Sequence, residues 1–240
     1  MFLNSALHAA LDRIAERAAD VRRAFTPGAV AQFDDVTTPN TSSDFTLDPL
    51  AVVAPDNAYF ITADDQGRAM YTRDGGFALR NGQLVDAAGG SVRGFCKGGD
   101  ALGALIVDPV DEALGRVRSP ELAADGTLSY LRETVDPRTG ARDRQRVVAG
   151  RIALARFPAG TRLTAADGGN RIAAPGTAPQ IGRANDGGFG SLVPMHRERS
   201  RIDIDESLVR LRDAYRAFDA LQAAEAAKAH LGKTAMDLVK

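Results

Sequence analysis

Tryptophan is absent from this sequence, and cysteine and histidine are scarce. Cys96 is the only cysteine, which excludes an intrachain disulfide framework and a zinc site built from cysteines. The three histidines, His8, His196 and His230, are scattered, and none has a second histidine or a cysteine at helical spacing. Aromatic residues form 6% of the chain, which suits neither a carbohydrate groove nor a platform for stacking bases. No metal site and no cofactor are therefore predicted.

A strong charge of either sign is also missing. The formal net charge is -1, so no global basic field indicates a nucleic-acid partner. Charged residues interrupt every apolar run well before the roughly 20 residues that a spanning helix needs, and no membrane insertion is expected. The N-terminus soon meets Asp12 and Arg13 without a basic start or an apolar block, so no cleaved signal peptide is expected.

The motifs of common catalytic sites are missing too. The sequence has no phosphate-binding loop and no serine in a nucleophile elbow. Gly187-Gly188-Phe189-Gly190 lacks the strand-to-helix context of a dinucleotide loop and is interpreted as a turn. The acidic turns at Asp64-Asp65 and Asn185-Asp186 lack the alternating ligands and the closing glutamate of a helix-loop-helix calcium site. We therefore predict no catalytic residues, no small-molecule substrate and no enzymatic activity.

Residues 1–28 predict an amphipathic helix. Its apolar residues recur at alternating spacings of four and three, which is a heptad seam. Charged residues, Asp20 among them, are expected on the other faces, and Thr26-Pro27-Gly28 is expected to end the helix because proline cannot continue it. The seam residues are Leu7, Leu11, Ile14, Ala18, Val21 and Phe25.

Residues 58–195 predict a β-rich domain. Short apolar stretches such as 58–62 and 69–72 are separated by turn pairs such as Asn81-Gly82. Such pairs are the strongest local hairpin signal, because glycine takes a positive φ without steric cost. The pattern predicts many short antiparallel strands. Residues 29–57 are predicted to be a connector.

Residues 196–240 predict the C-terminal helix. An apolar stripe runs along it, and alanines add helix propensity and permit close helix approach. Asp203 or Asp205 is expected to cap its start. We predict that this helix pairs with the first, antiparallel or parallel. The stripe residues are Leu208, Leu211, Tyr215, Phe218, Leu221, Leu231, Ala235 and Leu238.

The predicted fold class is therefore mainly β with terminal α-helices. The two helices form a discontinuous, coiled-coil-like core, and the β-rich domain lies between them in the sequence. A helix at each chain end leaves apolar surface for neighbouring subunits and favours assembly over a closed catalytic pocket. We expect helix packing to depend on Leu7, Leu11, Ile14, Val21, Leu208, Leu211, Tyr215, Phe218 and Leu221.

Several segments, in this order, resemble the family of flagellar basal-body rod and hook proteins. They are YTRDGGFAL at 71–79, NGQLV at 81–85, GRIALARF at 150–157, GGFGSLVP at 187–194, SRIDIDESLVRL at 200–211 and YRAF at 215–218. The residues that match the family pattern most directly are Thr26, Pro27, Gly28, Asp74, Gly75, Phe77 and Gly82.

The resemblance implies a structural role in the flagellar axis. Members of this family form a helical tube outside the inner membrane, with terminal helices inside and β-domains outward. It implies a location in the periplasmic rod of the basal body. The implied partners are copies of the chain itself, other rod and hook subunits, and the type III export apparatus, which needs no cleaved signal. The length of 240 residues suits a short rod-type member.

The sequence also departs from the family pattern. Charged residues of the stretch 16–25 stand where the family has paired asparagines, Arg201 replaces another asparagine, and Met195-His196 replaces a glycine. Two other functions stay open. One is a non-polymerising β-rich binding module whose terminal helices form a coiled-coil dimer. The other is a hydrolase with acidic residues in β-turns, although no paired-carboxylate spacing favours it.

Overall fold

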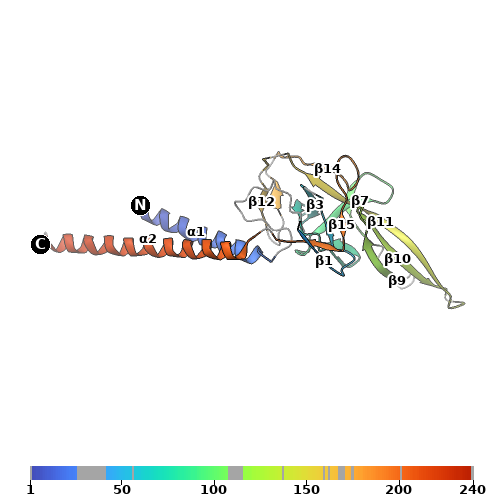
Figure 1. Ribbon diagram of the computed structural model, residues 1–240, viewed down its shortest axis with the longest axis horizontal. Coiled ribbons are helices and arrows are strands. Elements are labelled where there is room, and N and C mark those ends of the chain that lie inside the picture. Colours follow the sequence, from blue (N-terminus) through green and yellow to red (C-terminus); the bar gives the residue numbers. More distant parts are fainter. Residues whose placement is uncertain are drawn as a thin grey trace. The chain divides into compact units, whose positions relative to one another are not determined.

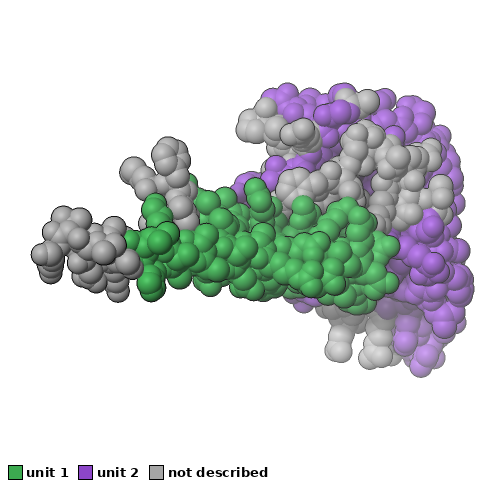
Figure 2. Space-filling model, turned by 60° about the vertical axis from the view of Figure 1, so that its left-hand side comes forward, with its two compact units in different colours: residues 1–25, 30–32, 202–240 green, residues 26–29, 33–201 purple. Residues whose placement is uncertain are grey.

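The computed structural model of the 240-residue chain has two compact units, coloured separately in Figure 2. One unit holds the two helices and the other holds the strands. The chain is thus mainly β with a helix toward each end, which confirms the predicted fold class. The structure describes residues 2–25, 42–55, 57–107, 116–136, 138–158, 160–161, 163–166, 171–173, 176–200 and 202–238.

The helical unit consists of α1 (Phe2–Arg23) and α2 (Ile204–Leu238), which lie side by side (Figure 1). The two helices run antiparallel, so the predicted pairing is confirmed and its direction is settled. Because α2 has 35 residues and α1 has 22, α2 extends beyond the start of α1. The α2 helix also continues past Gly232, where the glycine does not interrupt it.

Asp203 caps α2, as one of the two sequence alternatives predicted. Its Oδ1 accepts hydrogen bonds from the backbone N–H groups of Asp205 at 2.9 Å and Glu206 at 3.2 Å. These are donors that the first helical turn leaves without an intrahelical partner. Asp205 and Glu206 also place negative charge in the first turn, where the helix dipole favours it.

The β unit is built from antiparallel strands, most of which belong to one twelve-stranded sheet. The strands in chain order are β1 (Ser43–Phe45), β2 (Val52–Val53), β3 (Ala58–Ala63), β4 (Ala69–Thr72), β5 (Ala78–Arg80), β6 (Gln83–Val85), β7 (Ser91–Cys96), β8 (Leu102–Ala104), β9 (Arg116–Leu122), β10 (Thr127–Val135), β11 (Arg142–Arg156), β12 (Leu163–Ala165), β13 (Arg171–Ala173), β14 (Gln180–Arg183), β15 (Val193–Pro194) and β16 (His196–Glu198).

The Asn81-Gly82 pair forms the turn that the sequence predicted. Asn81 has φ 51° and Gly82 has φ 77°, and two successive positive values characterise the hairpin turn that matches strand twist. The turn joins β5 to β6, with Arg80 opposite Gln83. The backbone carbonyl of Gly82 also accepts a hydrogen bond from the N–H of Val107 at 2.7 Å.

The core surrounds β3 and the C-terminal half of β11. On one face, Phe60 and Leu154 join a large cluster with Phe77, whose ring meets that of Phe60 edge to face at 5.0 Å between centroids. On the other face, Tyr59 and Ala155 join a second, smaller cluster. Since successive side chains of a strand alternate between faces, these two strands are buried on both sides.

A long ribbon of β9, β10 and β11 departs from the short strands that the sequence predicted. The β11 strand has 15 residues and pairs with β10 from Arg142 to Arg151. Glu133 is buried on this ribbon, and Arg118, Arg142 and Arg144 approach its carboxylate to 3.9, 3.3 and 3.2 Å. The arginines compensate this buried charge, which lets a highly charged stretch form regular strands.

Three strands lie outside the predicted β-domain limits. The expected connector at 29–57 contains β1 and β2, and the expected helical segment at 196–240 begins with β16, so the helix starts only at Ile204. The pairs β1–β16 and β2–β15 explain the difference. Each strand is two or three residues long and depends on a partner more than a hundred residues away, which local patterns do not reveal.

A buried ion pair ties β16 to the rest of the β unit. The Arg73 Nε and a Glu198 carboxylate oxygen are 2.7 Å apart, and the two side chains are 4% and 1% exposed. The guanidinium also donates to the backbone carbonyls of Ala58 at 2.8 Å and Ala54 at 3.3 Å. These contacts distribute the hydrogen-bond donors of Arg73 over several acceptors and anchor the strand that precedes α2.

Gly75 is required by the close approach of β2, and we expect Gly75→Ala to destabilise the β unit. A Cβ atom at this position would lie 1.8 Å from the backbone oxygen of Val52. Such overpacking costs about 1–3 kcal/mol or more. The free energy of unfolding in urea measures the effect. Gly99→Ala is the control, since its nearest new contact would be at 3.8 Å; an equal effect of both substitutions would contradict the steric explanation.

Candidate assembly surface

The contact between the helices is narrow and contains small side chains. Ala10 and Ile14 of α1 are buried, as is Ser207 near the start of α2. Partly buried residues of α2 continue the contact at spacings of three and four, among them Ala214 and Leu221. The seam therefore follows the heptad spacing, but alanine and serine occupy several positions that larger residues would fill.

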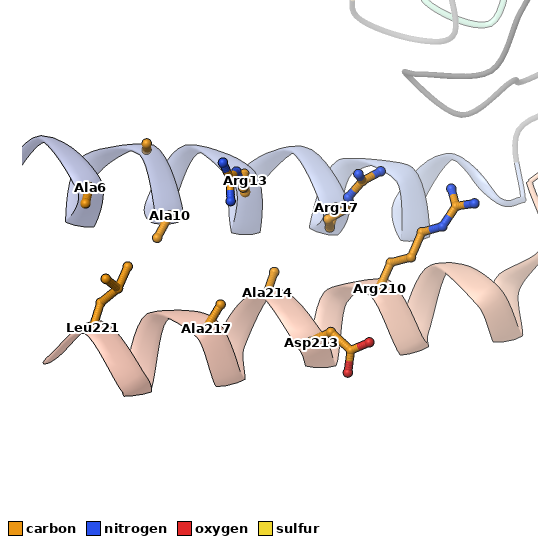
Figure 3. Close-up of a pocket in the computed structure, with 10 residues that line it drawn as sticks. Ala6, Ala10, Arg13, Arg17, Arg210, Asp213, Ala214, Ala217 and Leu221 are labelled. Atoms are coloured by element: carbon orange, nitrogen blue, oxygen red, sulfur yellow. The ribbon is translucent and has the colours of Figure 1, made fainter. Parts of the chain in front are cut away.

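Along one side of the pair, these small residues leave an open groove with a volume of about 480 Å³. Figure 3 shows Ala10, Ala214 and Leu221 pointing toward the facing helix, with Arg17 opposite Arg210 at one end. The order of the residues along the groove makes the antiparallel direction plain. The lining residues are Ala6, Ala9, Ala10, Arg13, Arg17, Arg210, Asp213, Ala214, Ala217 and Leu221.

The other side of the pair carries large apolar side chains that stay exposed. Leu11 is 49% exposed, Leu208 47% and Tyr215 51%. One flank of each helix lines the groove. Because each residue advances a helix by about 100°, Leu11, Leu208 and Tyr215 lie on the flanks that face away from the groove. These three residues form what we call the apolar face, and the partly buried Leu211 and Phe218 belong to the two-helix contact beside it.

The nine residues predicted for helix packing thus divide into three groups by their burial. Ile14 is buried, and Leu11, Leu208 and Tyr215 are about half exposed. The two-helix contact occupies one stripe on each helix, and the three exposed residues lie beside that stripe, about half accessible among the described residues. The role of all nine in assembly stays a prediction. The partly buried residues are Leu7, Val21, Leu211, Phe218 and Leu221.

Asp20 was expected on an outer face of α1, and the structure corrects this. The residue is 2% exposed, and its carboxylate lies 3.6 Å from Nη1 of Arg17 and 2.6 Å from Nη2 of Arg23. A carboxylate can be buried when cations neutralise it. Arg17 and Arg23, three residues before and after Asp20, were the sequence signal for this cluster. The heptad interpretation had instead assigned all three residues to the solvent-exposed faces.

The residues that match the family pattern have structural roles in the β unit. Asp74 and Phe77 are buried, Gly75 contacts β2, and Gly82 completes the β5–β6 turn, as described above. The Asp74 Oδ1 accepts a hydrogen bond from the backbone N–H of Gly76 at 2.9 Å. Gly75 thus serves the contact between its own segment and β2, whereas Gly82 serves a separate turn. The remaining motif, Thr26-Pro27-Gly28, lies outside the described residues.

Burial raises the pKa of the Asp74 carboxyl above its usual 3.8, despite the opposing effects of the Gly76 N–H and the Arg197 guanidinium. The folded chain therefore holds this proton more tightly than the unfolded chain does. Stability from Asp74 is present at low pH and is lost as pH rises from about 3.8 through the folded pKa.

We expect Asp74→Asn to stabilise the chain at neutral pH, because the amide keeps an oxygen acceptor for Gly76 without a buried charge. The advantage should vanish below about pH 3.8, where the wild-type carboxyl is protonated in both states. Urea unfolding of both chains across this pH range measures it. A pH-independent difference would contradict the proposed cause.

The described part of the chain has neither a cluster of metal ligands nor a helix suited to span a membrane. Within it, no three histidine, cysteine, aspartate or glutamate residues gather as metal ligands. No helix in these residues combines the length and apolar character needed to cross a membrane. Neither any protein-family model nor any curated protein matches this chain. The apolar face of the helix pair remains the strongest candidate for a functional surface.

Proposed function

We propose that this chain is a structural subunit of the bacterial flagellar rod that assembles through its terminal helices and has no enzymatic activity. The observation that carries the proposal is the apolar face, where Leu11, Leu208 and Tyr215 are about half exposed. Full burial of such side chains contributes roughly 1.5–3 kcal/mol each. Burial of the half that is still exposed would therefore contribute about 1 kcal/mol for each side chain. In a polymer, every subunit would make this contribution.

The ordered sequence segments that resemble rod and hook proteins support the flagellar part of the proposal. The paired terminal helices and the β-rich unit agree with the architecture that this resemblance implies. The partners in this function are copies of the chain, other rod and hook subunits, and the type III export apparatus. The site of action is the periplasmic rod, where the assembled tube transmits torque.

Deletion of the gene in the source bacterium tests this function directly. We expect cells without filaments, scored by motility and by electron microscopy. The intact gene should restore both, and copies that lack residues 1–28 or 203–240 should not. A copy with Ala223→Ser, an exposed position of α2 outside the apolar face, serves as the matched control and should restore swimming fully.

Normal flagella and swimming in the deletion strain would contradict the proposal. The apolar face would then fit the other function considered above, a binding module whose helices form a dimer of defined stoichiometry. Sedimentation of the purified chain distinguishes the two, because a dimer reaches a fixed mass whereas a polymer keeps growing with concentration.

A further inference from the structure

The N-terminal half of β11 has an unpaired edge in the described structure. Gly150 pairs with Leu128 of β10 on one edge and with Cys96 of β7 on the other. The β10 side continues to Arg142, but β7 ends at Cys96. Among the described residues, none pairs with positions 142–149 on the β7 side. We call this stretch the open edge of β11.

A hollow of about 390 Å³ lies at the base of the open edge. Lys97, the residue after β7, lines it together with the adjacent part of β11. Lys97, Arg132 and Arg146 contribute cations and no acidic residue lines the hollow, although Glu121, outside the lining, pairs with Arg146. Ile106 and Val148 are 54% and 41% exposed there, so apolar surface accompanies the positive charge. The lining residues are Lys97, Ile106, Tyr130, Arg132, Gln145, Arg146, Val147, Val148 and Ala149.

Positive charge also follows the open edge outward. Arg142, Arg144 and Arg146 alternate along β11, which places them on one face at intervals of about 7 Å. Two of them share the single carboxylate of Glu133 with Arg118. Three guanidinium groups around one carboxylate leave an excess of positive charge, and each of these arginine side chains is more than half exposed.

From these features we propose that an extended, acidic segment of another protein adds as a strand to the open edge of β11. Its backbone continues the line of β7, its carboxylates meet Arg142, Arg144 and Arg146, and its apolar side chains enter the hollow beside Ile106. Strand addition supplies main-chain hydrogen bonds, and alternate side chains supply specificity.

Charge excludes a second copy of the same edge as the occupant. Two open edges paired with each other would place arginines of one strand beside arginines of the other, and like charges across a strand pair are destabilising. Charged edges of this kind protect natural sheets from self-association. An acidic partner turns the same charges into attraction, which is why we assign the edge to a different protein.

A fluorescein-labelled peptide of alternating glutamate and valine tests the proposal by anisotropy with the full chain. We expect binding to the wild-type chain and about tenfold weaker binding to Arg144→Gln. Arg80→Gln is the control, since Arg80 is exposed on β5 of the same unit, and should bind as the wild type does. Hydrogen exchange should show that alternate amides of 142–149 gain protection when the peptide binds.

Two further peptides separate strand addition from simple charge attraction. A peptide with the same acidic residues but with prolines between them cannot form a ladder, and it should bind weakly. A peptide of alternating lysine and valine should not bind. Equal binding of the proline peptide, equal binding of the lysine peptide, or no added protection at 142–149 would each overturn the proposal.

Discussion

A chain that carries both Leu208→Asp and Tyr215→Asp should fail to assemble while its helix pair stays folded. Both side chains are about half exposed on the apolar face, so their replacement removes little packing within the chain. Assembly, by contrast, loses the burial of two apolar side chains. It would also bury two new carboxylates, and the desolvation of these charges costs several kcal/mol. We therefore expect the sedimenting polymer to disappear at concentrations where the wild-type chain assembles.

Sedimentation and electron microscopy measure this loss, and circular dichroism checks that the helices persist. The matched control is Ala220→Asp with Ala227→Asp, which adds the same two charges at the same spacing on exposed positions away from the apolar face. This control should assemble as the wild type does. If the Leu208 and Tyr215 double variant forms polymers at the same concentrations as the wild-type chain, the apolar face does not drive assembly.

The second large effect concerns the buried pair of Arg73 and Glu198, where we expect Glu198→Gln to destabilise the β unit by about 3–5 kcal/mol. The substitution keeps the shape of the side chain but leaves the Arg73 guanidinium, 4% exposed, without its compensating charge. Much of the cost comes from that isolated cation, because the low dielectric of the interior cannot solvate it.

Urea unfolding monitored on the β unit measures this cost. Asp44→Asn is the matched control: Asp44 pairs with Arg199 in the same region, with both side chains more than half exposed. Exposed pairs contribute little to stability, so the control should leave the unfolding midpoint nearly unchanged. Similar midpoints for the two variants would mean that the chain compensates Arg73 by other contacts.

Local signals predicted the elements that depend on neighbouring residues. The geometry of the β5–β6 turn depends only on Asn81 and Gly82 themselves. The Asp203 cap depends only on the backbone N–H groups of the first turn of α2. The two amphipathic helices follow from spacing alone. Their pairing also followed from matching apolar seams, but the antiparallel direction did not, since either direction buries a seam.

Elements that depend on distant partners were missed for the same physical reason. The β1–β16 pair joins Ser43 to Glu198, and neither short strand has a periodic pattern of its own. The length of β11 was hidden because its first half is exposed and rich in arginine, so it lacks an apolar alternation. The exposure of Leu11 and Tyr215 was missed because a heptad does not reveal which flank the partner helix covers.

The position of Glu198 has a mechanical consequence. The chain passes from this residue to the start of α2 at Ile204 within a few residues, and Ser43, the first residue of β1, is its partner across the strand pair. Tension applied along α2 therefore passes Arg199, which binds Ser42 and Asp44, before it reaches the bond between Glu198 and Arg73. Because this ion pair is held away from water, we expect it to break only when the two side chains are pulled apart, and its rupture to limit the rate at which force separates these strands.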